Sequence, residues 1–305
     1  MQLHGAVYSL KADGFDQEQK VILKGDLGSP EGLAYDWIHN NLYVSDWNLH
    51  KILVIDPETG ARKTLLTDVH RVRDIEVDPR TGWLYWISGW EDTAVLMKST
   101  LDGQNQAVIS SDLEVPMSLS LDYDEQRLYW TEVYRVNLIK SIRVDVLYMS
   151  IDYDEQRLYW TEVYRVNLIK SIRVDGEDVT IVHRPGRHYD FTPKYITVSR
   201  DFIYWTQSLY RVLGREKTNS REITRYRNLE KYGRWNIQKN RFMGILAIDP
   251  RKQTESPSLC GDNNGGCSHF CLPTLEQYTP PYNCVCPDGM NLMDDNKTCS
   301  DEAQN

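Results

Sequence analysis

The sequence predicts an all-β protein, a six-bladed β-propeller followed by a small disulfide-rich module. Two observations carry this prediction. A short aromatic motif recurs through the first 250 residues at a spacing close to that of propeller blades, and all six cysteines lie between Cys260 and Cys299. No apolar stripe with a 3.6-residue period competes with this pattern.

The repeat is an aliphatic residue followed by Tyr and an apolar residue. Its tyrosines are 42, 44, 30 and 45 residues apart. A period of about 40–45 residues with four short strands is typical of propeller blades. The five segments are Leu42-Tyr43-Val44, Leu84-Tyr85-Trp86, Leu128-Tyr129-Trp130, Leu158-Tyr159-Trp160 and Ile203-Tyr204-Trp205.

Each repeat unit has the same internal order. An apolar-alternating strand, such as residues 32–36 or 118–122, comes first and ends in Asp. A polar turn, the Tyr strand, a third strand, a glycine hairpin and a fourth strand follow. Glycine fits such hairpins because the turn requires positive φ. The expected hairpins are Asp13-Gly14, Thr59-Gly60, Asp102-Gly103 and Asp175-Gly176. Each unit is therefore a four-stranded meander.

Segments near the two ends of the chain are predicted to form one blade together. Residues 7–10 resemble a third strand, whereas residues 243–249 resemble a first strand. Together they give a sixth blade that lacks its second strand. One meander cannot bury its faces alone, so the blades are expected to stack into a ring. The first blade is therefore incomplete, which suggests truncation at the N-terminus.

Residues 122–145 repeat identically as residues 152–175. Other blade pairs share only the pattern, so identity over this length indicates a very recent duplication or an error in assembling the sequence. The corresponding 30-residue step is short by about one strand and a linker relative to the blade period. The first copy is therefore expected to lack its outer strand.

The cysteine cluster predicts an oxidising, extracellular environment, because dense even-numbered cysteines typify disulfide-stapled modules. A zinc site is the alternative, but paired C-x2–4-C or H-x3–5-H elements are not present. No segment approaches the roughly 18 apolar residues of a membrane helix, and no signal peptide is visible. An oxidised module without an export signal suggests a fragment of a longer protein.

The Tyr-Trp-Thr segments resemble the YWTD repeat of the LDL-receptor family, and Pro30-Glu31-Gly32-Leu33-Ala34 before a blade reinforces the match. In that family the fourth motif position, Asp46 here, makes a structural hydrogen bond. The segments 260–273 and 284–290 resemble the EGF-like module that follows such propellers. The resemblance implies the pairs Cys260–Cys271, Cys267–Cys284 and Cys286–Cys299. The expected domains are a propeller over residues 1–255, an EGF-like domain over 256–300 and a tail over 301–305.

Composition and motifs argue against several other functions. The net charge of −9 is unsuited to nucleic acid, which requires a basic surface. No serine-hydrolase, phosphate-loop or zinc-protease motif occurs, so no enzyme is expected. A metal-dependent propeller hydrolase would need ligands such as the recurrent first-strand aspartates, Asp36, Asp78, Asp122, Asp152 and Asp249. We favour a turn role for these residues.

No cofactor is expected. Calcium-binding EGF modules carry acidic and amide residues before the first cysteine, whereas Glu255 is the single carboxylate in residues 255–259. We therefore expect no calcium in this module.

Two groups are candidates for protein binding. His183 and His188 flank a basic loop, and histidine changes charge near endosomal pH, so they are pH-sensing candidates. A solvated loop is the simpler interpretation. Residues 211–241 carry ten Lys or Arg against three Glu, which would suit an acidic partner or form a solvated blade edge. The partner-binding candidates are Arg184, Arg187, Arg211, Arg215, Arg221, Arg225 and Arg227.

The sequence therefore predicts a non-enzymatic extracellular protein-binding module of an endocytic lipoprotein-receptor-like protein, which engages ligand or aids its acid-dependent release. The resemblance implies a protein ligand, and acidic ligand-binding repeats of the same parent chain as a possible second partner. A nidogen-like adhesion module and a signalling co-receptor ectodomain are the alternatives. Membrane attachment would come only through an anchor in the parent chain. Asn296-Lys297-Thr298 is the one N-glycosylation sequon.

Overall fold

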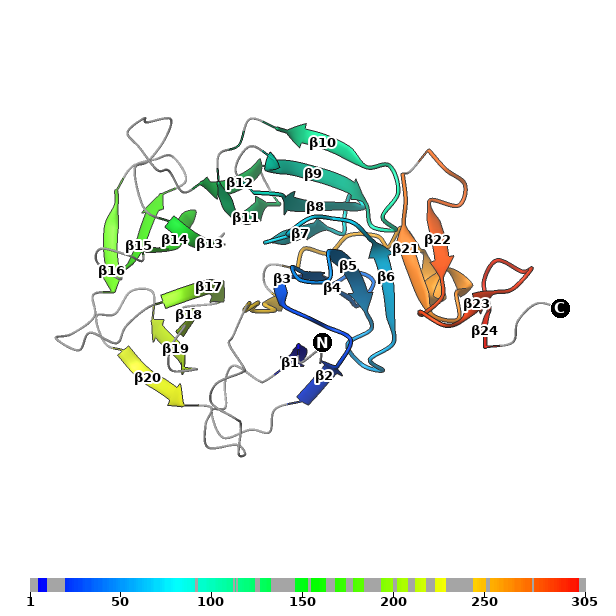
Figure 1. Cartoon of the computed structure of the whole chain (residues 1–305), viewed down its shortest axis with the longest axis horizontal. Helices are drawn as coiled ribbons and strands as arrows, with labels where there is room; N and C mark the ends of the chain where they lie inside the picture. The colour runs from blue at the N-terminus through cyan, green and yellow to red at the C-terminus, as the bar shows by residue number, and fades with distance from the viewer. Residues whose placement is uncertain are drawn as a thin grey trace. The chain divides into compact units, whose positions relative to one another are not determined.

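The computed structural model describes part of the chain. The described residues are 5–9, 20–90, 93–111, 113, 115–123, 127–132, 146–152, 155–162, 168–173, 178–183, 193–199, 202–207, 212–217, 223–228, 244–250, 253–275 and 277–301. The chain divides into two compact units (Figure 1). The first contains residues 1–89, 93–112 and 253–305, and the second contains residues 90–92 and 113–252.

The first unit contains three of the expected sheets. A two-stranded sheet pairs β1 with β2, and two four-stranded antiparallel sheets have the orders β3-β4-β5-β6 and β7-β8-β9-β10. The strands are β1 (Ala6–Ser9), β2 (Lys20–Lys24), β3 (Pro30–Asp36), β4 (Asn41–Asp46), β5 (Lys51–Ile55), β6 (Arg62–Leu66), β7 (Ile75–Asp78), β8 (Trp83–Ser88), β9 (Val95–Thr100) and β10 (Ala107–Ser110).

The second unit contains the remaining blade sheets. In its described residues β11 pairs with β12, and two four-stranded meanders have the orders β13-β14-β15-β16 and β17-β18-β19-β20. The strands are β11 (Pro116–Asp122), β12 (Arg127–Glu132), β13 (Val146–Asp152), β14 (Arg157–Glu162), β15 (Leu168–Arg173), β16 (Thr180–His183), β17 (Pro193–Ser199), β18 (Phe202–Gln207), β19 (Val212–Lys217) and β20 (Ile223–Asn228). The meander prediction is confirmed for four of the six sheets.

The motif strands β4, β8, β14 and β18 form the core of their units, because each lies between a first and a third strand. In the first unit Tyr43 and Trp86 are buried at 0% and 1% exposure among aliphatic residues from both four-stranded sheets. In the second unit Tyr159 and Trp205 are buried with Ile169, Ile196 and Ile203. Large aromatic side chains contribute much apolar area, so the motifs of these four strands supply a large share of the burial.

The third position of the YWTD-type motif, counted from the Tyr, carries a hydroxyl that joins neighbouring strands by hydrogen bonds. Ser45 Oγ accepts a bond of 2.8 Å from Gly32 N in its own sheet and donates one of 3.5 Å to Val72 O before β7. Thr161 Oγ1 donates to Lys194 O of β17 at 3.0 Å. A buried hydroxyl between neighbouring sheets fixes their register, since any slip would leave it unpaired.

Two hairpins have the expected glycine geometry. Gly60, between β5 and β6, has a φ of 76°, and Gly103, between β9 and β10, has a φ of 82°. These are left-handed conformations that a β-carbon disfavours. The hairpins predicted at residues 13–14 and 175–176 lie outside the described residues.

The C-terminal module has the disulfide pattern that the family resemblance implies. Its disulfides are Cys260–Cys271, Cys267–Cys284 and Cys286–Cys299. A short 3-10 helix (Asp262–Gly266) precedes β21 (Phe270–Pro273), which pairs with β22 (Tyr282–Val285), and β23 (Asn291–Leu292) pairs with β24 (Cys299–Ser300). A module this small depends on its bridges, because it buries little apolar surface of its own.

The C-terminal module also packs into the first unit. Phe270 and Leu272 of β21 are buried in the same cluster as Tyr43, Trp86 and Leu101. Polar contacts surround this apolar joint. Asn283 Nδ2 donates to Asp102 Oδ2 at 2.9 Å, and Trp37 Nε1 donates to Thr254 O at 3.2 Å.

Asp288 holds the module against the outer strand β6. Its backbone N–H donates to Arg62 O, and its carboxylate accepts from Thr64 N at 2.9 Å, from Thr64 Oγ1 at 2.8 Å and from Lys63 Nζ at 3.3 Å. Burial alone would raise the pKa of this carboxyl, but the bonds from Thr64 and the charge of Lys63 outweigh burial, so the pKa is lowered. The bonds therefore favour the ionised form.

We expect Asp288→Asn to lower the free energy of unfolding at neutral pH. A carboxyl with a lowered folded-state pKa contributes stability above its unfolded value near 4, and this contribution is lost as pH falls through the folded value. The difference between wild type and variant should therefore be constant from pH 7.4 to 5.5 and shrink below about pH 4. Urea unfolding across this range checks it. A difference that disappears already at pH 5.5 would contradict the assignment.

Candidate ligand-binding face

A cluster of aromatic, basic and histidine side chains occupies two loops of the first unit. Trp47 and His50 lie in the loop between β4 and β5, and His70, Arg71 and Arg73 lie in the loop between β6 and β7. We call these five residues the loop face. His70 and Arg71 are exposed and the other three are partly buried, so the side chains are accessible.

Trp47 is the aromatic centre of the loop face. The guanidinium of Arg73 lies 4.6 Å from the centroid of its ring, and that of Arg71 lies 5.8 Å away. Both distances suit a cation–π contact, which holds each guanidinium against the ring. Two ordered guanidinium groups beside an aromatic surface can bind carboxylates and cover an apolar side chain.

His50 and His70 form a pair. Their ring centroids are 5.1 Å apart in an edge-to-face arrangement, and His50 Nδ1 accepts a bond of 3.3 Å from Arg71 N. The backbone holds both residues in place, since Val69 N donates to His50 O and Gly89 N donates to His70 O. A protonated imidazole has no acceptor nitrogen, so protonation of His50 removes the bond to Arg71 N. It also adds positive charge beside two arginines.

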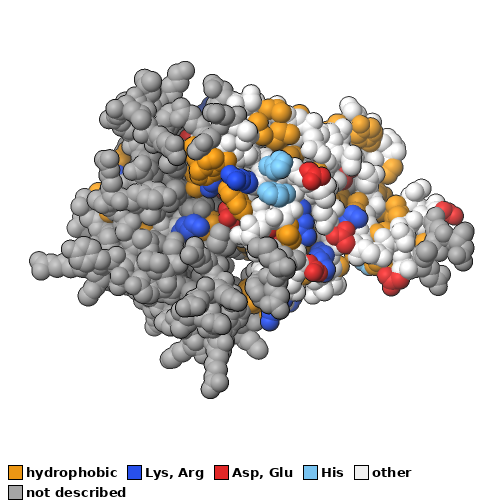
Figure 2. All heavy atoms as spheres, in the orientation of Figure 1, with side chains coloured by type: hydrophobic (Ala, Val, Ile, Leu, Met, Phe, Trp, Pro, Cys, Tyr) orange, Lys and Arg blue, Asp and Glu red, His pale blue; other side chains and the backbone are white. Residues whose placement is uncertain are grey.

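Figure 2 shows two histidine side chains together on the face in view, with Lys or Arg, hydrophobic, and Asp or Glu side chains nearby. The clustering combines exposed apolar area with positive charge. Such a surface favours an acidic protein segment over a purely apolar one, because opposite charges steer and orient the partner.

Asp46 positions the loop that carries Trp47. Its carboxylate is completely buried and accepts four backbone N–H groups, from Gly28 at 2.6 Å, Ser29 at 3.0 Å, Asn48 at 3.1 Å and Leu49 at 3.0 Å. The family's structural aspartate thus fastens both the segment before β3 and the loop after β4. The four bonds compensate the burial of a charged group.

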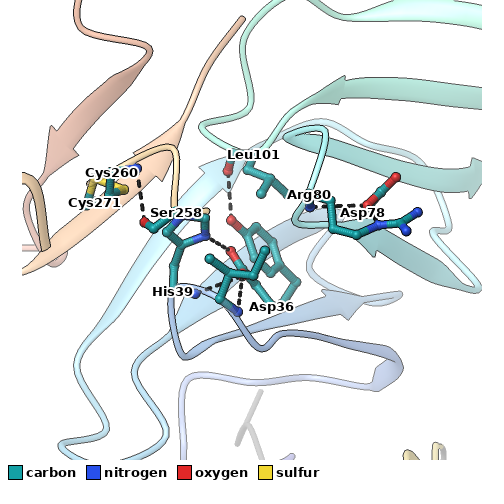
Figure 3. Close-up of polar contacts among 10 residues, drawn as sticks. Asp36, His39, Asp78, Arg80, Leu101, Ser258, Cys260 and Cys271 are labelled. Carbon is teal, nitrogen blue, oxygen red and sulfur yellow. Dashed lines mark hydrogen bonds and ion pairs between the residues drawn. A yellow bond between two sulfur atoms is a disulfide. The ribbon is translucent and has the colours of Figure 1, made fainter. Parts of the chain in front are cut away.

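Three of the five aspartates at the ends of first strands accept turn N–H groups, and Figure 3 shows two of them, Asp36 and Asp78. Asp36 accepts from Ile38 N, His39 N and His39 Nδ1, Asp78 accepts from Arg80 N, and Asp152 accepts from Glu155 N. These bonds agree with the expected turn role. In the described residues no group of three or more His, Cys, Asp or Glu side chains is arranged to hold a metal ion.

The loop face differs from the site that the sequence suggested. His183 is the last residue of β16, and the structure describes its backbone but not its side chain. His188 lies outside the described residues. Arg184, Arg187, Arg211 and Arg221 also lie outside them, whereas Arg215 on β19 and Arg225 and Arg227 on β20 are placed by backbone only. These candidates stay predictions. Sequence reasoning missed the pair of His50 and His70, because they are 20 residues apart and meet only through two loops.

Asn296 lies in an exposed turn of the C-terminal module. Asp295 Oδ1 accepts from the backbone N–H of both Lys297 and Thr298 at 2.8 Å, and Asn296 has a φ of 55°. An exposed turn is accessible to a glycosyltransferase, which favours use of the sequon. Glycosylation of Asn296 stays a prediction. Among the described residues, no helix is both long and apolar enough to cross a membrane.

Fold, motifs and disulfides define a YWTD-type β-propeller followed by an EGF-like module. Comparison with known proteins confirms the resemblance to the LDL-receptor family. The chain is 24% identical over 296 residues to the vitellogenin receptor Yl of Drosophila melanogaster, a match that covers 95% of this chain and 12% of the relative. This chain therefore corresponds to a small part of that receptor.

Other comparisons concern the module and the fold. The family described as "Coagulation Factor Xa inhibitory site" matches residues 260–299. A gluconolactonase from Xanthomonas campestris is similar in structure, with a TM-score of 0.56 and 15% identity over 72% of this chain and 84% of that one. A nidogen/laminin complex structure matches at 20% identity over 71% of this chain and 70% of that one, with a TM-score of 0.37. At such identity the gluconolactonase shares the fold alone.

Proposed function

We propose that this chain is a non-enzymatic protein-binding module of an endocytic receptor, and that the loop face binds an acidic protein segment. The single observation that carries the proposal is the stacking of Arg71 and Arg73 on Trp47 beside the pair of His50 and His70. The homologue is named as a receptor for vitellogenin, which supports a protein ligand for this chain as well.

Acid should strengthen this binding. Histidine is the side chain that gains charge between neutral and endosomal pH. Protonation of His50 and His70 would place two more charges beside the two arginines, so an acidic segment would bind more tightly. If that segment belongs to the ligand-binding repeats of the parent chain, it would compete with an external ligand on acidification. This competition would constitute the release step.

An acidic peptide of Asp and Glu tests the proposal. We expect it to bind about three- to tenfold more tightly at pH 5.5 than at pH 7.4, because each exposed charge pair contributes up to about 1 kcal/mol. Affinity should fall with added salt, since exposed charges are screened. Calorimetric titration at both pH values and two salt concentrations measures both effects.

Two double variants distinguish the contribution of the arginines to binding from that of the histidines. Arg71→Gln with Arg73→Gln should weaken binding at both pH values. His50→Gln with His70→Gln should remove the pH dependence and leave the affinity at pH 7.4 close to wild type. His269→Gln in the EGF-like module is the matched control and should change neither. An affinity that does not change with salt concentration, or a pH dependence that persists in the double histidine variant, would exclude the loop face as the binding site.

A further inference from the structure

Ser88 occupies the position in β8 that Asp46 occupies in β4. Each is the last residue of its motif strand and the fourth motif position counted from the Tyr. The backbone bonds around the two residues correspond as well. The residue after Asp46 donates its N–H to Ser29 O at 2.9 Å, and the residue after Ser88 donates its N–H to His70 O at 2.7 Å. His70 is therefore the counterpart of Ser29 in the segment that leads into the next four-stranded sheet.

The two side chains hold this segment through opposite backbone groups. In the first of these sheets, the carboxylate of Asp46 accepts the N–H of Ser29 at 3.0 Å. In the second, the hydroxyl of Ser88 donates to the carbonyl of His70 at 2.9 Å. An ionised carboxylate only accepts hydrogen bonds, whereas a hydroxyl can also donate. The residue type at this position therefore decides which backbone group is held.

The bond from Ser88 fixes one member of the histidine pair. Ser88 is 8% exposed, so water competes little for its hydroxyl. Val69 N donates to His50 O at 3.1 Å, which holds the same segment from the other side. The ring of His70 lies 5.1 Å from that of His50, centroid to centroid. A shift of the His70 carbonyl would turn its backbone and move its ring away from His50.

We propose that Ser88 is a positioning residue of the loop face, and that its hydroxyl sets the place of His70 beside His50. The inference rests on the proposed function, because it concerns how the acid response of that site is built. Ser88 carries no charge, and neither do the described residues that follow it, 89–90 and 93–94. The charged side chains nearest to the pair in the described sequence are therefore those of the two loops, Lys51, Asp68, Arg71 and Arg73.

Contact between the two histidine rings tests the proposal without a ligand. NMR on the full chain with labelled histidine measures cross-relaxation between the ring protons of His50 and His70. Ser88→Ala fits the same space but lacks the hydroxyl, so it should weaken this signal or remove it. Ser99→Ala is the matched control and should retain it, because Ser99 Oγ donates to a backbone carbonyl within β9, that of Thr100, at 2.9 Å.

Ser88→Asp separates a positioning role from a purely structural one. This variant has the residue that β4 carries at the same position. If Ser88 only stabilised the sheet, the aspartate would support the segment as Asp46 does and the ring contact would persist. The proposal predicts the loss of ring contact, because a carboxylate cannot donate to His70 O.

Binding of the acidic peptide is the second readout. In Ser88→Ala, the ratio of affinities between pH 5.5 and 7.4 should fall from about three- to tenfold to below about twofold. The affinity at pH 7.4 should stay close to wild type, because both arginines remain on Trp47. Ring contact that persists in both Ser88 variants, or a full pH ratio without ring contact, would overturn the proposal. A wild-type chain that binds no acidic peptide would refute the proposed function, and the ring contact would still decide the role of Ser88.

Discussion

Phe270→Ala should lower the stability of the first unit by about 3–5 kcal/mol, as is usual when a buried aromatic side chain is truncated. Phe270 is 3% exposed and belongs to the cluster that contains Tyr43, Trp86 and Leu101, although it lies in the EGF-like module. The cavity would open at the joint between module and blades. The three disulfides remain intact, so the module itself should keep its fold.

Urea unfolding followed by tryptophan emission measures the change. Tyr278→Ala is the matched control within the same module, because Tyr278 is 47% exposed and its truncation should shift stability by less than about 0.5 kcal/mol. If both variants unfolded like wild type, the EGF-like module would not share its core with the first two four-stranded sheets.

Asp46→Ala is expected to destabilise the first unit by about 3 kcal/mol or more. Four backbone N–H groups would lose their shared acceptor, and each buried unsatisfied donor is unfavourable by about 1–3 kcal/mol. Asp46→Asn keeps one acceptor oxygen and should lose less. Thermal and urea unfolding of both variants measure the order wild type, Asn, Ala.

The same variants also report on the loop face. Asn48 and Leu49 lie between Trp47 and His50, so release of their N–H groups should weaken binding of the acidic peptide as well. A stable Asp46→Ala protein with unchanged peptide affinity would show that Asp46 does not position the loop.

The repeat pattern predicts most of the fold because each blade obeys local rules. The Tyr motif identifies the central strands, the terminal aspartates identify turns, and the glycines at positions 60 and 103 identify hairpins. Each of these depends on residues close in sequence. The disulfide pairing follows instead from the family resemblance, and the structure contains the same three bridges.

The remaining features depend on contacts between distant segments. Nothing in the sequence around His50 indicates His70, since the two loops meet only after β5 and β6 pair. Likewise, Asp288 and Thr64 are 224 residues apart. The expectation that the first copy of the duplicated blade lacks its outer strand concerns residues 133–145, which lie outside the described residues, so it stays a prediction.

The most direct test of the proposed function is amide hydrogen exchange with and without the acidic peptide at pH 5.5. The account predicts slower exchange in residues 47–50 and 69–73, with the EGF-like module unchanged. Protection confined to residues 211–241, where the sequence also predicts a basic surface, would contradict the assignment to the loop face and place the binding site in the other unit.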